Sequence, residues 1–128
     1  MQLLTLYLAT AVVFLGIDAV MLKTVMRPLF ERHISLFLRE DLNLAPAAIF
    51  YLFYVAGVLF FVSWPALTAG SAAQALLPAA LLGAMAYGTY EFTNFATLKG
   101  WHWTMATTDV VWGTFLTAIS AYAGIKIT

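Results

Sequence analysis

Residues 3–22 read LLTLYLATAVVFLGIDAVML, an almost unbroken apolar run that ends just before Lys23. A helix needs about 20 mostly apolar residues to cross the hydrocarbon core of a bilayer. The run therefore predicts a membrane-spanning helix, which we expect to be retained because no positive region precedes it as in a cleaved signal. Asp18 does not fit that setting, since a carboxylate in hydrocarbon costs about 2.5–3.5 kcal/mol on insertion scales.

Three further apolar runs of similar length follow, over residues 46–64, 75–97 and 104–124. The composition agrees with four spans, because 63% of the residues are hydrophobic and 9% are charged. Soluble domains are roughly 45–50% apolar and about 25% charged, and a soluble chain this short could not bury so much apolar surface. The sequence thus predicts an all-α bundle of four transmembrane helices that forms one domain over residues 1–128.

The segment between the first two spans has a helical pattern of its own, over residues 28–41. Apolar side chains recur at helical spacing at Phe30, Ile34 and Leu38, and charged residues occupy the other faces. This pattern predicts a short amphipathic helix at the membrane interface, with Pro28 at a first helical position. A loop helix that only covers the bundle is an equal alternative.

Basic residues are distributed unevenly between the predicted loops. Four of them lie in the first loop and Lys99 lies in the third, whereas the loop between spans two and three has none. Because short cytoplasmic loops carry the excess of Lys and Arg, we expect the first and third loops to be cytoplasmic. Both termini are then expected on the outer side.

Several functional classes are disfavoured by what the chain lacks. The formal net charge is zero, which does not suggest a nucleic-acid partner. Cysteine is absent, so disulfides and thiolate metal sites are excluded. The sequence has no P-loop, zinc-protease histidine pair, nucleophile elbow or dinucleotide fingerprint. His33 and His102 fall at predicted interfaces, where we expect them to be ordinary exposed residues.

Two more acids share the environment of Asp18, because Glu91 and Asp109 also lie inside predicted spans. At 1.5 Å per residue, Asp18 is about 7–8 Å from Lys23 and Glu91 is about 12 Å from Lys99. Asp109 lies about 9 Å inside its end of the fourth span by the same measure. All three therefore fall at similar depth in the cytoplasmic half, where three helices of a small bundle could bring them together.

The third span suggests which way Glu91 faces. Ala80, Ala84 and Gly88 repeat every four residues and predict a face that allows close helix contact. Glu91 continues nearly the same side and is therefore expected to point into the bundle.

Four residues near the acids are candidates for positioning a ligand. Tyr87 and Asn94 share the side of Glu91, and Trp112 shares a helical face with Asp109. The second span supplies no acid but offers Tyr54 as a hydrogen-bond partner. We expect these four side chains to line the site that the acids define.

The chemistry open to Asp18, Glu91 and Asp109 is limited. Burial favours the neutral form of a carboxyl, so at least one of the three is expected to be protonated near neutral pH unless a cation is bound. The cluster could carry out acid–base catalysis, or it could hold a divalent cation such as Mg²⁺ or Ca²⁺ through oxygen ligands. Structural bonds to neighbouring helices are the competing interpretation of the same residues.

The chain resembles a known family in two of its segments. These are Tyr90-Glu91-Phe92-Thr93-Asn94-Phe95-Ala96-Thr97-Leu98-Lys99-Gly100-Trp101 and the following Asp109-x-x-Trp112-Gly113-Thr114. They resemble the small bacterial inner-membrane proteins of domain-of-unknown-function family 2177, and the resemblance extends over essentially the whole chain. It implies a multi-pass protein of the bacterial inner (cytoplasmic) membrane and supports the choice of Asp18, Glu91, Asn94 and Asp109, but it implies no reaction.

These observations favour a protein that binds or modifies a lipid or other apolar small molecule, with membrane lipid as its partner. A deep polar site beside an amphipathic helix, without a soluble domain, is the reason for that preference. A proton- or cation-coupled transporter is the first alternative, and it would require a homodimer. A structural subunit of a larger membrane complex is the second.

Overall fold

A computed structural model describes residues 2–34 and 44–128, and the described chain contains helices and no strand. Four of its helices are long and apolar enough to cross a membrane, as predicted. They are Gln2–Ile34, Ala45–Thr68, Ala72–Thr97 and Trp103–Ile127. The elements in chain order are α1 (Gln2–Met21), η1 (Leu22–Met26), α2 (Arg27–Ile34), α3 (Leu44–Val58), η3 (Leu59–Ser63), α4 (Trp64–Thr68), η4 (Ala72–Ala75), α5 (Leu76–Thr97) and α6 (Trp103–Ile127).

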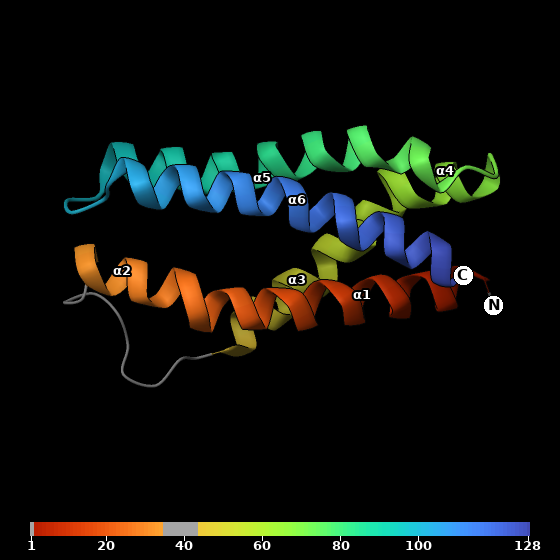
Figure 1. The fold of residues 1–128 in the computed structure, drawn as a ribbon, viewed down its shortest axis with the longest axis horizontal. Coiled ribbons are helices and arrows are strands. Elements are labelled where there is room, and N and C mark those ends of the chain that lie inside the picture. The colour runs from red at the N-terminus through yellow and green to blue at the C-terminus, as the bar shows by residue number, and fades with distance from the viewer. Residues whose placement is uncertain (1, 35–43) are drawn as a thin grey trace.

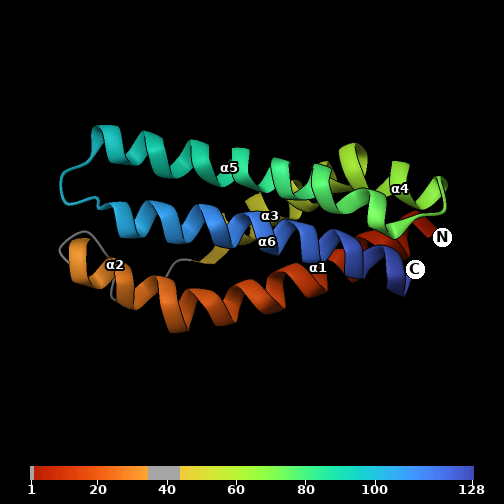
Figure 2. The same ribbon diagram turned by 45° about the horizontal axis from the view of Figure 1, so that its top comes forward.

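The bundle is built around an antiparallel hairpin of α5 and α6, which has the most extensive helix contact in the molecule. α1 packs against α6, and α3 crosses the bundle obliquely (Figures 1 and 2). The first part of α3 contacts α1, η3 contacts α6, and α4 contacts η4. Because of this crossing, α3 lies close to the other helices at one end and away from α5 at the other.

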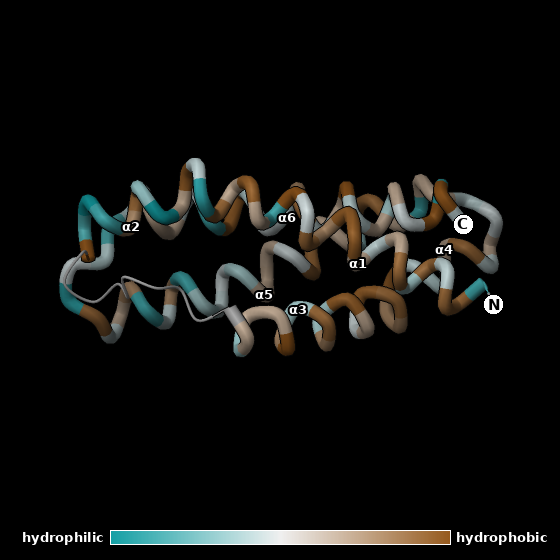
Figure 3. Tube along the Cα trace, turned by 90° about the horizontal axis from the view of Figure 1, so that it is seen from below, coloured by the Kyte–Doolittle hydropathy of each residue, from teal (hydrophilic) through white to brown (hydrophobic). Residues whose placement is uncertain are grey.

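Both connections that carry basic residues lie at one end of the bundle. α2 and the turn between α5 and α6 are at that end, while both termini and the turn between α4 and η4 are at the other (Figure 1). Hydrophilic positions gather at the α2 end, and the middle of the bundle is mainly hydrophobic (Figure 3). The arrangement agrees with the prediction that the first and third loops face the same side.

Two helices continue through prolines at which the sequence predicts a boundary. The π-helical segments Leu22–Met26 and Leu59–Ser63 each end two residues before a proline, Pro28 and Pro65. A proline inside a helix lacks an N–H and clashes with the carbonyl four residues earlier. A wider π turn accommodates the ring, so the helix bends without ending. The second span consequently reaches Thr68, beyond the predicted end at residue 64.

Because the first helix continues through Pro28, the predicted interfacial helix is not a separate element. An amphipathic helix is present at the expected place, but α2 (Arg27–Ile34) follows directly from η1 and is continuous with the first span. The 33-residue helix Gln2–Ile34 is longer than the roughly 20 residues that a bilayer core requires. Its polar last turns therefore extend beyond the hydrocarbon. The predicted continuation to residue 41 lies outside the described residues.

Glycines bring α5 and α6 close together. A Cβ atom on Gly83 would meet the carbonyl oxygen of Gly113 and would lie 2.8 Å from Oγ1 of Thr117. The buried small residues of α5 are Ala79 and Gly83. The predicted stripe of Ala80, Ala84 and Gly88 is therefore displaced by one position, and a Cβ on Gly88 would meet no atom within 4 Å.

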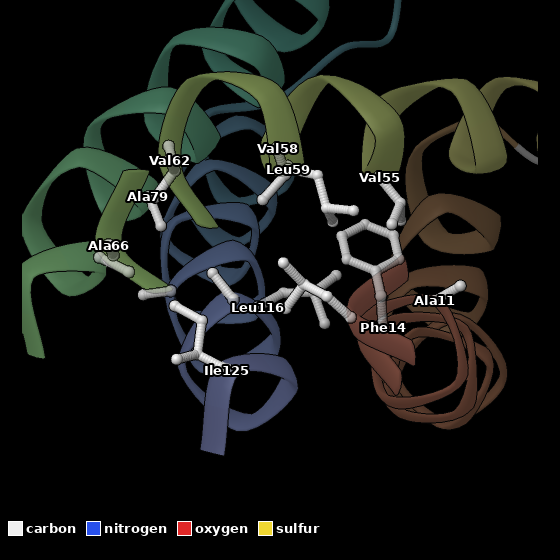
Figure 4. Packing of buried hydrophobic residues seen from close by; sticks show 14 residues of the cluster. Ala11, Phe14, Val55, Val58, Leu59, Val62, Ala66, Ala79, Leu116 and Ile125 are labelled. Carbon is white, nitrogen blue, oxygen red and sulfur yellow. The ribbon is translucent and has the colours of Figure 1, made fainter. Parts of the chain in front are cut away.

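The apolar core fills the centre of the bundle. Side chains from α1, α3 and α6 meet there, including Phe14, Val55 and Leu116 (Figure 4). The ring of Phe14 also packs against Tyr51 and Tyr54, with centroid separations of 5.4 and 5.7 Å. Many large apolar side chains remain exposed on the outside, as a lipid-facing surface requires. The apolar core therefore lies directly against Tyr51 and Tyr54 of α3.

Candidate functional site

A cavity of about 460 Å³ lies between the first helix, α3 and α5, in the half of the bundle that holds α2. It occupies the space left where α3 and α5 separate. Helix α6 contributes the lining residue Asp109. We call this space the interhelical cavity. Its lining residues are Asp18, Leu22, Met26, Phe30, Ala47, Phe50, Tyr51, Tyr54, Ala86, Tyr87, Tyr90 and Asp109.

The polar part of the wall consists of two acids and four tyrosines. Asp18 is 8% exposed and Asp109 is 9% exposed, so both carboxyls border the cavity while being almost enclosed by protein. The four tyrosines come from α3 and α5, as the lining residues show. No Lys, Arg or His within residues 2–34 and 44–128 lines this cavity. The described wall therefore offers carboxyls, phenol hydroxyls and aromatic rings, but no cationic group.

Asp18 is held by a residue of another helix. The indole Nε1 of Trp112 on α6 donates a hydrogen bond to Oδ1 of Asp18 at 3.1 Å. The hydroxyl of Tyr51 on α3 also interacts with this carboxyl. These two partners fix the orientation of Asp18, and they explain how a carboxyl is retained in an apolar helix.

Glu91 is the most deeply buried of the three acids, at 0% exposure. Its Oε1 accepts a hydrogen bond from Nε1 of Trp101 at 2.9 Å. Its Oε2 is buried, and the Glu91 carboxyl interacts with that of Asp109. Glu91 does not line the interhelical cavity, whereas Asp109, with which it interacts, does.

Asp109 lies between the other two acids. It interacts electrostatically with Glu91 on α5 and with Asp18 on α1. The structure therefore brings the three predicted carboxyls near one another from three different helices. Only Asp18 and Asp109 face the cavity, however, which separates the predicted cluster into two groups.

The arrangement of these acids offers little to a metal ion. Among the described residues, no three His, Asp or Glu side chains are grouped so that they could hold one. Glu91 also uses one oxygen for Trp101. The predicted divalent cation on Asp18, Glu91 and Asp109 thus gains no support from the geometry.

Two of the predicted ligand-positioning residues, Tyr54 and Tyr87, line the cavity. The hydroxyl of Tyr54 shares a hydrogen bond of 3.0 Å with Oγ1 of Thr117. Tyr87 packs its ring against Gly113, where a Cβ atom would overlap the ring. The hydroxyl oxygen of Tyr87 is buried and has no partner, so other atoms of this side chain line the cavity.

The other two predicted ligand-positioning residues do not line the cavity. Trp112 acts on Asp18 through its indole N–H, so it orients an acid of the wall. Asn94 is partly buried and interacts with Tyr90, one turn beyond the lining residues of α5. Neither residue is in a position to touch a molecule in the interhelical cavity.

Sequence reasoning did not assign three aromatic residues to the site. Tyr90 lines the cavity, although its neighbour Glu91 was the predicted member. Phe30 and Phe50 line it from the flanking helices. Phe30 occurs in the apolar pattern of residues 28–41, which indicated burial but no particular neighbour. Only the course of α3 across the bundle brings these side chains together.

Trp101 donates a hydrogen bond to Glu91 and packs between two aromatic rings. The ring of Phe30 lies 5.5 Å from its ring and that of Tyr90 lies 6.1 Å away, between centroids. Gly100, with φ +84°, allows the chain to turn there, and a Cβ on it would lie 3.0 Å from the carbonyl oxygen of His33. The turn between α5 and α6 is therefore packed onto α2.

The two histidines also meet at this contact. The rings of His33 and His102 are stacked, with centroids 4.6 Å apart and planes inclined by 9°. Nδ1 of His102 accepts a hydrogen bond from the backbone N–H of Thr104 at 3.1 Å and so caps α6. A structural role in joining α2 to the turn accounts for both residues.

Among known protein families, the chain matches the family described as predicted membrane protein (DUF2177), over residues 3–126. The chain belongs to the DUF2177 family. This result confirms the resemblance noted from the sequence and, with the four spans, a multi-pass membrane protein. No curated protein and no solved structure matches the chain.

Proposed function

We propose that the protein binds a lipid or other apolar small molecule in the interhelical cavity. The observation that carries this proposal is the cavity itself, about 460 Å³ in volume and lined mainly by apolar and aromatic side chains with two acids. Ligand sites in proteins have volumes of about 300–1,000 Å³ and combine apolar walls with a few polar groups. The cavity has both properties.

The position of the cavity supports a ligand that arrives through the membrane. Two of its lining residues are strongly exposed on the outer surface of the bundle, Phe50 at 59% and Tyr90 at 52%. In a membrane-spanning bundle, this surface is in contact with lipid. A molecule dissolved in the bilayer would therefore reach the cavity sideways, between α3 and α5, without passing through water.

The acids and tyrosines would recognise the polar part of the ligand. Asp18 and Asp109 border the cavity together with the four tyrosines. In acid–base chemistry the same two carboxyls would exchange a proton with the ligand, while Trp112 keeps Asp18 in place. We further propose that the protein lies in a bacterial inner membrane with the basic α2 end in the cytoplasm and both termini outside.

The experiment is to purify the protein in mild detergent and identify co-purified molecules by mass spectrometry. Ala47 lines the cavity, whereas the adjacent Ala48 is exposed on the outer surface. The variant Ala47→Phe fills the cavity, and Ala48→Phe adds the same side chain to the lipid-facing side. We expect Ala47→Phe to lose a molecule that the parent protein and Ala48→Phe retain.

Two results would contradict the proposal. One is an absence of any co-purified molecule in the parent protein, together with an unchanged lipid profile in cells that lack the gene. The other is a co-purified molecule that Ala47→Phe retains in full. A stoichiometric partner protein found in the same preparation would favour the structural-subunit hypothesis in its place.

A further inference from the structure

We propose that the ligand of the interhelical cavity is an organic cation, an ammonium or related onium group attached to an apolar body. This inference rests on the proposed function and narrows its ligand class. It follows from two properties of the described wall, namely its charge and its aromatic rings.

The charge of the wall selects the sign of the ligand. Among the described residues, the groups able to carry charge that line the cavity are Asp18, Asp109 and the four tyrosines, all acids. A carboxylate and a cation attract each other more strongly in a buried site than in water, because the local dielectric constant is lower. An anionic group in the same position would face two carboxyls without a compensating cation from the described residues.

Aromatic rings form much of the remaining wall. Tyr51 and Tyr54 come from α3, Tyr87 and Tyr90 come from α5, and Phe30 and Phe50 complete the set. A cation within about 6 Å of a ring centroid is attracted by the negative face of the ring, by about 2 kcal/mol or more when it is desolvated. Rings from α2, α3 and α5, together with carboxyls from α1 and α6, are thus suited to an onium group.

The basic residues of the same end do not oppose a cation in the cavity. The described residues Lys23 and Lys99 are exposed, and neither lines the cavity. Arg27 forms an ion pair with Glu31, at 3.0 Å between Nε and Oε1. These groups lie at the polar end of the bundle, where lipid phosphates are found, and the acids lie deeper. An amphiphilic cation could place its charge at the acids without approaching these basic residues.

The test uses tetraphenylphosphonium and tetraphenylborate, which have nearly the same shape and opposite charge. Binding to the parent protein is measured by equilibrium dialysis in dodecyl maltoside micelles, against protein-free micelles of the same concentration. We expect the protein to bind the phosphonium at least about tenfold more tightly than the borate, a difference of about 1.4 kcal/mol. Tighter or equal binding of the borate would overturn the inference without any variant having to fold.

Variants then assign the effect to the cavity. Asp109→Asn and Asp18→Asn keep the side-chain shapes and remove the charges, and we expect each to weaken phosphonium binding about tenfold. Glu31→Gln removes a carboxylate at the same end but outside the cavity, and it should leave binding unchanged. Equal affinity in all three variants would contradict the inference.

The source of the cation is determined by competition. Phosphatidylethanolamine carries an ammonium headgroup and dodecyl maltoside carries none, so a lipid ligand would displace the phosphonium when this lipid is added to the micelles. A free amphiphilic cation as the natural ligand would leave phosphonium binding unaffected by the lipid. If Ala47→Phe removes a co-purified neutral molecule and the parent protein does not bind the phosphonium, the proposed function stands and the cation inference fails.

Discussion

Helix α5 takes part in two contrasting regions of the molecule. Gly83, one turn after the buried Ala79, meets Gly113 and Thr117 of α6 in a tight contact, which we call the seam. Further along the helix, Tyr87 and Tyr90 border the interhelical cavity, and the ring of Tyr87 also packs against Gly113. The seam holds the helices together by close backbone approach, whereas the cavity is kept open by large rings and by the divergence of α3. The contrast indicates that close helix packing and ligand binding are assigned to successive turns of one helix.

The largest predicted effect is in the seam. In Gly83→Ala the new Cβ would meet the carbonyl oxygen of Gly113, a backbone atom that cannot move without separating the helices. We expect a loss of about 1–3 kcal/mol in the free energy of unfolding, measured as a lower thermal midpoint in detergent. Gly88→Ala on the same helix is the control, since a Cβ there meets no atom within 4 Å. Equal midpoints for the two variants would remove the distinction between seam and open face.

An intermediate effect is predicted behind the cavity. Trp101→Phe removes the N–H that binds Oε1 of Glu91, and it leaves a fully buried acid without that bond. The expected loss is about 1–3 kcal/mol in unfolding free energy. Trp103→Phe is the matched control, because Trp103 is 62% exposed and contacts aromatic side chains of α5. A loss that is as large in the control would assign the effect of Trp101 to packing alone.

The smallest effect is predicted outside both regions. Arg27 and Glu31 form an ion pair one turn apart on α2, with side chains 28% and 51% exposed. Exposed pairs of this kind contribute about 0.3–0.5 kcal/mol. Glu31→Gln should therefore change the thermal midpoint only slightly, and the change should vanish at high salt, where exposed charges are screened. A large change would show that α2 depends on this pair for its position.

Much of the fold could be predicted from the sequence because membrane spans have a strong signature. Length and apolar composition gave four helices, and the basic residues gave two loops on one side. The prolines were harder to interpret, since Pro28 and Pro65 resemble a helix start and a turn. In an apolar setting the backbone groups must be bonded internally, so a helix widens at a proline more readily than it ends. No local pattern distinguishes these two outcomes.

The candidate site was predictable only in part, and the reason lies in helix α5. Two stripes of small residues are present there, Ala80-Ala84-Gly88 and Ala79-Gly83, with the same spacing of four. Periodicity cannot choose between them, and the partner helix decides. A shift by one position rotates the helix by about 100°, which is enough to keep Asn94 away from the cavity and bring Tyr90 to it. The three acids could be identified from the sequence because a charged residue within a span stands out whichever way the helix is rotated.

The central claim is that Asp109 is present for the cavity and not for the stability of the bundle. Its neighbours include two other carboxyls, Glu91 and Asp18. A further negative charge beside them, inside a membrane span, is unfavourable. The most direct measurement is the thermal midpoint of Asp109→Asn in detergent against the parent protein. We predict a midpoint that is equal or higher, because the amide removes the unfavourable acid and can donate a hydrogen bond to Glu91. A midpoint several degrees lower would contradict the account and make Asp109 a structural bond between the helices.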